Sequence, residues 1–284
     1  MKKTGLYLLF FVQSFMLLSQ KHEVLEPALL EVRYKLVMQQ DTIHKNNGMV
    51  DSMILRIGDR VSQFFSYRTF YYDSIWTDPE GRKIAEELTL EAFRTGNHSK
   101  RPEVGSTYEY MYKNYPEKKL TVMSKRLVAG FTYKEEYLPQ NWIVSDSIKQ
   151  ILGHDCRAAS CDFRGRTFFA WFAPDIPVKD GPWKLNGLPG LILEAYDKSG
   201  HYHFLATNIQ TKELSPLTFF RFEEYPYIET DRKLFLKSIK MYLSGERIED
   251  IDLIKDVIWK GKKQLYFRKT KKTLLYDFLE RDYE

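Results

Sequence analysis

Hydrophobic and polar residues alternate along many short segments of the chain, which is the pattern of a β-strand with one buried face. The segment 30–38 shows it most clearly, because Leu30, Val32 and Tyr34 alternate with charged residues. The same alternation, or a run rich in β-branched and aromatic residues, predicts strands at 53–57, 61–67, 154–163, 166–173, 191–197, 201–207 and 217–222, and three more within 106–137. The sequence therefore predicts a mainly β fold, a curved antiparallel sheet or open half-barrel.

Two segments have instead the 3.6-residue period of an amphipathic helix. The first begins after Asp78-Pro79, a helix N-cap followed by proline at the first helical position, and ends at Gly96. The second follows Thr230-Asp231 and carries apolar residues from Leu234 to Leu243. We expect two amphipathic helices that cover the sheet with their apolar faces.

A segment without any period, residues 174–190, separates two predicted hairpins. Prolines and glycines interrupt it, and Pro189-Gly190 fits a type II turn in which Gly190 takes a positive φ. Unstructured segments of this length in compact domains are often functional or packed as ordered loops. The segment is therefore the best candidate for a ligand-binding loop over an apolar cavity, and the alternative is that it fills the core and orders the second hairpin.

The N-terminus resembles a secretory signal. Two lysines precede the mostly apolar run from Gly5 to Leu18, which is shorter than the ~20 residues that cross a bilayer. We expect residues 1–19 to be a signal peptide, with an uncleaved anchor as the alternative, and residues 20–284 to be a single β-rich domain with a less regular tail from about 245. No later segment is apolar enough for an integral membrane protein.

The charge is mild, with 43 basic and 38 acidic residues and a net charge of +5. A nucleic-acid-binding protein would be expected to concentrate its basic residues in one patch. The basic run within 260–272 is offset by acidic residues at 280–284, and we expect it to be a solvated tail. The sequence predicts no nucleic-acid partner.

The series around the loop resembles one known family. Residues 187–192 read Gly-Leu-Pro-Gly-Leu-Ile, preceded by Gly181-Pro182-Trp183 and by Phe-Arg-Gly-Arg at 163–166. This is similar to the GLPGLI family of exported Bacteroidetes proteins, and the resemblance covers most of the mature chain. It implies export to the periplasm, the outer membrane or the cell exterior. The family has no established activity, so the resemblance implies no catalytic residues.

The two cysteines, Cys156 and Cys161, lie five residues apart on one predicted strand. An odd separation places their side chains on opposite faces, about 16 Å apart along an extended strand, whereas a disulfide needs Cα atoms within ~7 Å. In an exported protein, however, a disulfide is the usual state of a cysteine pair. A mutual disulfide and two buried free thiols both remain open.

His201 and His203 lie two residues apart on a predicted strand, so both imidazoles face the same side and can chelate zinc or copper. The third ligand would be His154, Asp155 or Cys156, if the two hairpins pair. The alternative is a pair of exposed histidines without a role. Nucleotide-binding glycine motifs and the Gly-x-Ser-x-Gly elbow are missing from the sequence, which predicts no cofactor.

Three functional hypotheses follow. The first is a non-enzymatic cell-envelope protein that binds an apolar or peptide ligand on the concave side of the sheet, in a cavity of at least ~300 Å³. Its expected ligand contacts are Trp171, Trp183, Leu188 and Pro189. The second is an accessory or structural partner of an outer-membrane system, with an exposed apolar patch or sheet edge. The third is a metal-dependent enzyme that uses the two histidines.

Overall fold

The computed structural model describes residues 22–39, 48–127, 130–222, 227–244 and 277–282. The predicted signal peptide and most of the predicted tail from 245 lie outside these residues. The described part is mainly β, as the sequence predicts, with three helices. Its helices are α2 (Tyr67–Thr77), α3 (Pro79–Thr95) and α4 (Arg232–Ser244). None of them is both long and apolar enough to cross a membrane.

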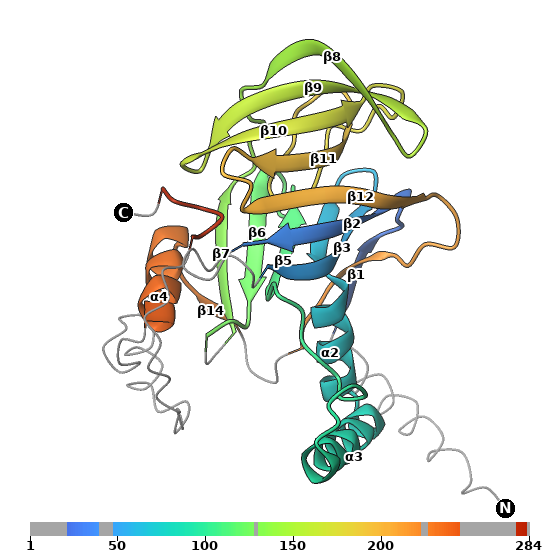
Figure 1. Ribbon diagram of the computed structural model, residues 1–284, viewed down its shortest axis with the longest axis vertical. Coiled ribbons are helices and arrows are strands. Elements are labelled where there is room, and N and C mark those ends of the chain that lie inside the picture. Colours follow the sequence, from blue (N-terminus) through green and yellow to red (C-terminus); the bar gives the residue numbers. More distant parts are fainter. Residues whose placement is uncertain (1–21, 40–47, 128–129, 223–226, 245–276, 283–284) are drawn as a thin grey trace, which may run out of the picture.

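Twelve of the described strands form one sheet, in the order β14-β7-β6-β5-β4-β3-β2-β12-β11-β10-β9-β8 (Figure 1). These strands are β2 (Leu30–Met38), β3 (Met49–Ile57), β4 (Ser62–Ser66), β5 (Glu109–Lys113), β6 (Lys119–Ser124), β7 (Phe131–Glu136), β8 (Ile143–Ile151), β9 (His154–Phe163), β10 (Arg166–Ala173), β11 (Leu191–Asp197), β12 (Tyr202–Gln210) and β14 (Ile228–Glu229). A small second sheet pairs β1 (Glu23–Glu26) with β13 (Leu217–Phe219).

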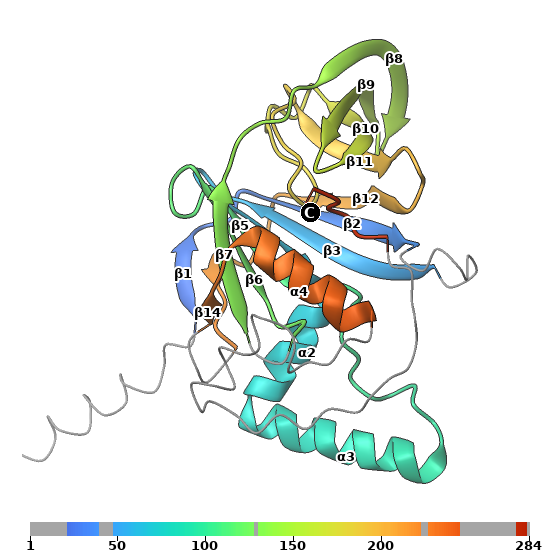
Figure 2. The ribbon, with the colours of Figure 1, turned by 90° about the vertical axis from the view of Figure 1, so that its left-hand side faces the viewer.

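The large sheet is curved but does not close into a barrel. Its strands pair antiparallel throughout, except for the short parallel contact between β14 and β7. Figures 1 and 2 show that β5–β7 run in a different direction from β8–β12, and that α4 lies beside β7. The predicted curved antiparallel sheet is therefore confirmed.

The main core lies against one face of this sheet. Alternate residues of β2 point into it, as the sequence predicts, and Val32 and Tyr34 are almost completely buried. Phe235 and Ile239 of α4 pack against the same core, which confirms that this helix covers the sheet. The Tyr34 hydroxyl donates a hydrogen bond of 2.7 Å to the carbonyl of Ile192 on β11, joining the first long strand to the second hairpin.

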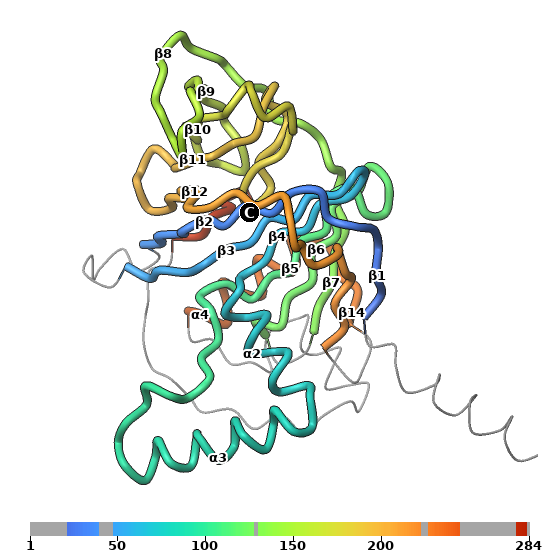
Figure 3. Tube along the Cα trace, turned by 90° about the vertical axis from the view of Figure 1, so that its right-hand side faces the viewer, coloured from blue at the N-terminus to red at the C-terminus, as the bar shows by residue number. Residues whose placement is uncertain are grey.

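The helix α3 has the predicted ends but not the predicted position. The Asp78 side chain accepts a hydrogen bond from the Gly81 amide, and Gly96 ends the helix at a φ of 72°. The helix packs against α2 and projects from the sheet, as Figures 2 and 3 show. Ile84 and Phe93 are 58% and 71% exposed, so the expectation that this apolar face covers the sheet is wrong.

The helix α2 was not expected from the sequence, because its residues are mostly aromatic, β-branched or polar and have modest helix propensity. The Ser66 side chain caps it by accepting a hydrogen bond from the Thr69 amide. Tertiary contacts with β3, β4 and α3 thus outweigh a weak local preference.

Residues 174–190, here called the crossing loop, fill the inner side of the sheet. The side chains of Trp183, Leu185 and Leu188 are buried in the main core. Earlier in the loop, Asp180 and Gly181 bind the ammonium group of Lys113, a completely buried residue of β5. The ammonium lies 2.5 Å from an Asp180 carboxylate oxygen and 2.6 Å from the Gly181 carbonyl. The loop therefore packs as part of the core, which is the alternative that the sequence left open.

Gly190 is needed for a different reason from the one expected. It is not among the residues with positive φ, so the predicted left-handed conformation at this position is wrong. A Cβ at Gly190 would lie 2.3 Å from the Ala173 carbonyl oxygen, a backbone atom. The glycine thus allows two backbone segments to approach closely.

We predict that Gly190→Ala lowers the free energy of unfolding by about 1–3 kcal/mol, because backbone must move to admit the methyl group. Gly48→Ala is the control, since the nearest atom to a Cβ there is the Gln39 side-chain oxygen at 3.4 Å. It should change stability by no more than about 0.5 kcal/mol. Urea denaturation followed by circular dichroism measures both, and equal effects would contradict this explanation.

Candidate functional site

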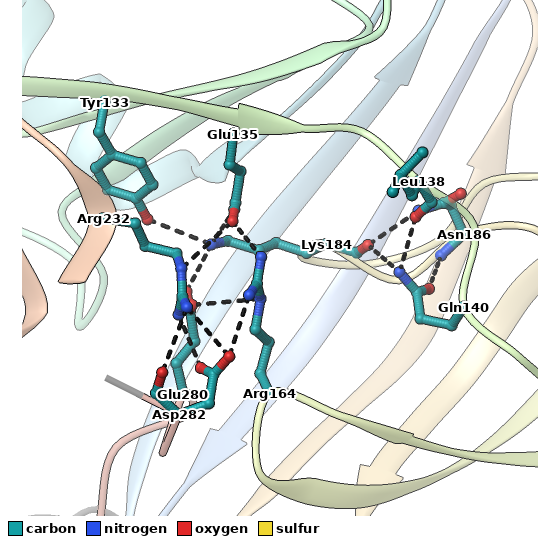
Figure 4. Close-up of polar contacts among 10 residues, drawn as sticks. All are labelled: Tyr133, Glu135, Leu138, Gln140, Arg164, Lys184, Asn186, Arg232, Glu280 and Asp282. Atoms are coloured by element: carbon teal, nitrogen blue, oxygen red, sulfur yellow. Dashed lines mark hydrogen bonds and ion pairs between the residues drawn. The ribbon is translucent and has the colours of Figure 1, made fainter. Parts of the chain in front are cut away.

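A cluster of ion pairs joins five separate parts of the chain beside the crossing loop (Figure 4). We call it the charge network. It contains Glu135 of β7, Arg164 of the β9–β10 turn, Lys184 of the crossing loop, Arg232 of α4, and Glu280 and Asp282 of the 277–282 segment.

Lys184 occupies the centre of the network. Its side chain is 2% exposed, and its ammonium lies 2.6 Å from a Glu280 carboxylate oxygen. It also pairs with Glu135 and donates a hydrogen bond of 3.3 Å to the Tyr133 hydroxyl. Such a buried cation requires several acceptors, because transfer from water costs several kcal/mol. The cost is offset here by two carboxylates and one hydroxyl.

Two arginines complete the network. Arg232 contacts Glu280 and Asp282, each at 2.7 Å, and Arg164 contacts Asp282 at 3.1 Å. Burial alone would raise the pKa of Asp282, but hydrogen bonds from both arginines outweigh it and hold the pKa below its usual value. Both arginines also pair with Glu135, so the carboxylates and cations neutralise one another.

Side-chain amides fix the neighbouring end of the crossing loop (Figure 4). The Gln140 side-chain oxygen accepts a hydrogen bond of 2.8 Å from the Asn186 backbone N–H. The Asn186 side chain donates to the carbonyls of Leu138 and Lys184, both at 3.2 Å. The segment after β7 therefore holds Lys184 in position through the loop backbone.

An open cleft of about 520 Å³ lies over the charge network and these amides. Its walls include Glu135, Gln140, Arg164, Lys184 and Arg232. The buried Nε of Arg164 makes no hydrogen bond with any described residue and lies 3.8 Å from Glu280. Guanidinium, ammonium and amide groups are the donors that bind carboxylates and peptide carbonyls. The cleft is therefore suited to a polar, anionic or peptide ligand.

A buried arginine outside the charge network, Arg166 of β10, binds the 277–282 segment. Its guanidinium donates to the carbonyls of Phe278 and Leu279 at 3.0 and 3.1 Å, and pairs with Asp277 at 2.6 Å and Asp197 at 2.7 Å. Burial alone would raise the pKa of Asp277, but hydrogen bonds from Arg166 and His201 hold it below its usual value.

The four expected ligand contacts do not form one site. Trp183 and Leu188 are buried in the core, and Trp183 also borders a cavity of about 90 Å³. Trp171 is half-buried, with the Lys149 ammonium 5.6 Å from its ring centre, and Pro189 is exposed. The cavity is smaller than the ~300 Å³ expected for an apolar ligand site.

The two histidines of the metal hypothesis bind different carboxylates. His201 pairs with Asp277, and the His203 Nε2 lies 2.8 Å from Glu194. His154, a proposed third ligand, pairs with Asp175 at 2.6 Å. Among the residues with described positions, no group of three histidine, cysteine, aspartate or glutamate side chains could hold a metal ion.

Cys156 and Cys161 are both buried free thiols, which is one of the two arrangements that the sequence left open. Both side chains belong to the main core, although their odd separation predicted opposite faces. The reason is a shift in the alternation of β9, where Cys156 and Ala159 are both buried. Burial raises the pKa of Cys156 to about 11 and that of Cys161 to about 12, which keeps both thiols protonated at neutral pH.

Sequence reasoning missed the charge network because each of its members looks like an ordinary surface residue. Glu135 and Glu280, for example, are far apart in sequence and have no distinctive neighbours. One signal was present: Arg164 and Arg166 belong to the Phe-Arg-Gly-Arg turn. Two arginines in a tight turn next to a buried aromatic strand indicate cations whose side chains have fixed positions in the fold.

We predict that Lys184→Met lowers the free energy of unfolding by about 3 kcal/mol, because it leaves two buried carboxylates without their central cation. The estimate is at the low end for a buried pair, since Arg164 and Arg232 still contact Glu135. Lys119→Met is the control, because Lys119 is 42% exposed and pairs with the exposed Glu136. It should cost less than about 1 kcal/mol by the same urea titration. Comparable losses would show that Lys184 is not a buried anchor.

We also predict that stability falls in acid. The pKa values of Asp277 and Asp282 are lower in the folded protein, so their contribution is complete above the unfolded value of about 3.9 and is lost as the pH falls through the folded values. The difference in unfolding free energy between the parent and Asp277→Asn should therefore stay constant above about pH 5 and shrink as the pH falls below about 4. The exposed Asp155→Asn, on β9, should show no such trend. A constant difference for Asp277→Asn would contradict the linkage.

Comparison with known proteins finds one family model that matches a short segment, and two solved structures of low similarity. A family model described as a protein of unknown function (Porph_ging) matches residues 163–194, and this family is associated with Bacteroidetes. No curated protein matches. Two solved structures of PNGF-II, in space groups P21 and C2, are similar with TM-scores of 0.48 and 0.44 and identities of 13% and 14%. They cover 73% and 82% of this chain, which spans only 32% and 33% of theirs. The matched family segment is the one that supplies Arg164 and Lys184.

Proposed function

We propose that this is an exported, GLPGLI-type protein of the cell envelope that binds a peptide ligand without catalysing a reaction. The observation that carries the proposal is the open cleft of about 520 Å³ over Arg164, Lys184 and Arg232. Export is supported by the basic and apolar N-terminal sequence and by the family resemblance of residues 181–192. Export places the cleft in contact with peptides outside the cytoplasm.

A peptide fits the geometry better than a large apolar ligand. The crossing loop fills the inner face of the sheet with Trp183, Leu185 and Leu188, and the enclosed cavity there is about 90 Å³. The walls of the cleft are instead polar, with three cations that are paired within the charge network and the side-chain amide groups of Gln140 and Asn186. Peptides carry both the carbonyls and the carboxylates that such groups bind.

A second candidate function, an accessory partner of an outer-membrane system, is favoured by β8. This strand is an edge of the large sheet, and eight of its nine residues are exposed. Ile143 and Ile148 are 74% and 70% exposed. An exposed edge strand with apolar side chains can pair with a strand of another protein.

We predict that native mass spectrometry of the protein, purified from the periplasm of its source, detects bound peptide. Arg232→Gln should reduce the bound fraction at least about tenfold, because it removes one charged contact of the cleft. Arg157→Gln is the control: Arg157 is 46% exposed and pairs with the fully exposed Asp146 on β8. Its occupancy should equal that of the parent.

Two results would argue against the proposal. Protein that carries no peptide after gentle purification would show that the cleft is not occupied in the cell envelope. Peptide that remains bound to Arg232→Gln would place the binding surface elsewhere. The second candidate would then be favoured if the protein captured another protein through β8 and if Ile148→Lys abolished that capture.

A further inference from the structure

The 277–282 segment contacts the rest of the protein in the way that a bound peptide contacts its receptor. It lies beside α4 and near β12 (Figure 1, red). Its backbone is held by hydrogen bonds from the Arg166 guanidinium to two carbonyls and from the Tyr202 hydroxyl to the Asp277 carbonyl at 2.6 Å. The Arg281 amide donates to the Arg164 carbonyl at 2.9 Å. Backbone contacts of this kind recognise a peptide main chain in any sequence.

The apolar side chains of the segment enter the core. Phe278 and Leu279 pack against the main cluster, and both border the 90 Å³ cavity together with Trp183, Tyr202 and Phe235. These two side chains thus form part of the wall of the cavity. Without them, the apolar surface around the cavity would lose part of its cover.

The acidic side chains of the segment balance the cations of the protein. Asp277 pairs with Arg166, Glu280 with Lys184 and Arg232, and Asp282 with Arg164 and Arg232. Arg164, Arg166, Lys184 and Arg232 are the four cations. Outside the segment, their described ion pairs involve only two carboxylates, Glu135 and Asp197. The surface under the segment is therefore cationic around an apolar centre.

We propose that residues 277–282 are an internal ligand in a peptide site that adjoins the open cleft and shares Lys184 and Arg232 with it. The external ligand is a peptide of the same chemistry. Its pattern is two adjacent apolar side chains flanked by carboxylates, Asp-Phe-Leu-Glu-Arg-Asp in this chain. The external peptide displaces the segment and takes over its contacts with Arg166, Lys184 and Arg232. This inference rests on the proposed function, because it assumes that the cleft over the charge network receives a peptide.

The test uses the full-length protein and a fluorescein-labelled synthetic peptide with the sequence Asp-Phe-Leu-Glu-Arg-Asp. A tethered segment competes at an effective concentration of millimolar order, so the parent should bind the labelled peptide less tightly than a variant with a weakened segment. The variant Phe278→Ala/Leu279→Ala weakens the internal ligand and should bind the peptide at least about tenfold more tightly by fluorescence anisotropy. Glu280→Gln is a milder second variant, which should shift affinity in the same direction if the double variant does not fold.

A matched peptide, Asn-Phe-Leu-Gln-Arg-Asn, tests the charges and should bind the double variant at least about tenfold more weakly than the acidic peptide. Equal binding of the acidic peptide to the parent and to both variants would overturn the inference. So would the absence of binding to variants whose near-ultraviolet circular dichroism shows a folded core. Neither result removes the proposed function, which is decided separately by the peptide found on the protein from its source and by its loss in Arg232→Gln.

Discussion

The buried contact between Lys113 and Asp180 is the constraint on which the rest of the structure depends. The Lys113 side chain is completely inaccessible, and desolvation lowers its pKa although Asp180 favours the charged form. Loss of either partner would leave an isolated charge in the core, which proteins tolerate poorly. The contact therefore fixes the middle of the crossing loop, and Trp183, Lys184 and Asn186 follow Asp180 within six residues. This one pair therefore helps to position both the buried apolar side chains of the loop and Lys184 of the charge network.

The crossing loop has two different environments on neighbouring residues. Trp183 packs among aromatic side chains of the core, with its ring 5.6 Å from that of Phe168, while Lys184 faces the carboxylates of the charge network. Trp183 has a φ of 53°, an uncommon value for a residue with a bulky side chain. The surrounding contacts hold this conformation, and it turns successive side chains toward the core and the cleft.

Features that depend on residues close together in the chain, such as strand faces and helix ends, could be predicted from the sequence. Alternation of period two located strands such as β2, and the Asp78 and Gly96 signals located the ends of α3, because strand faces and helix caps are set within a few residues. The position of α3 could not be predicted, since its apolar residues do not specify which partner they meet. The candidate site was missed for the same reason. Its charges come from β7, the β9–β10 turn, the crossing loop, α4 and the 277–282 segment, and only the folded chain brings them together.

The ion pair between Glu135 and Arg164 has a consequence for the architecture. Glu135 lies on β7, near one end of the strand order, and Arg164 lies in the turn beside β9, near the other end. In a closed barrel, backbone hydrogen bonds would seal this seam. Here side chains bridge the two ends of the strand order instead. The half-barrel is therefore held across its open side by charge, and its stability across that side depends on pH and salt in a way that a closed backbone ladder would not.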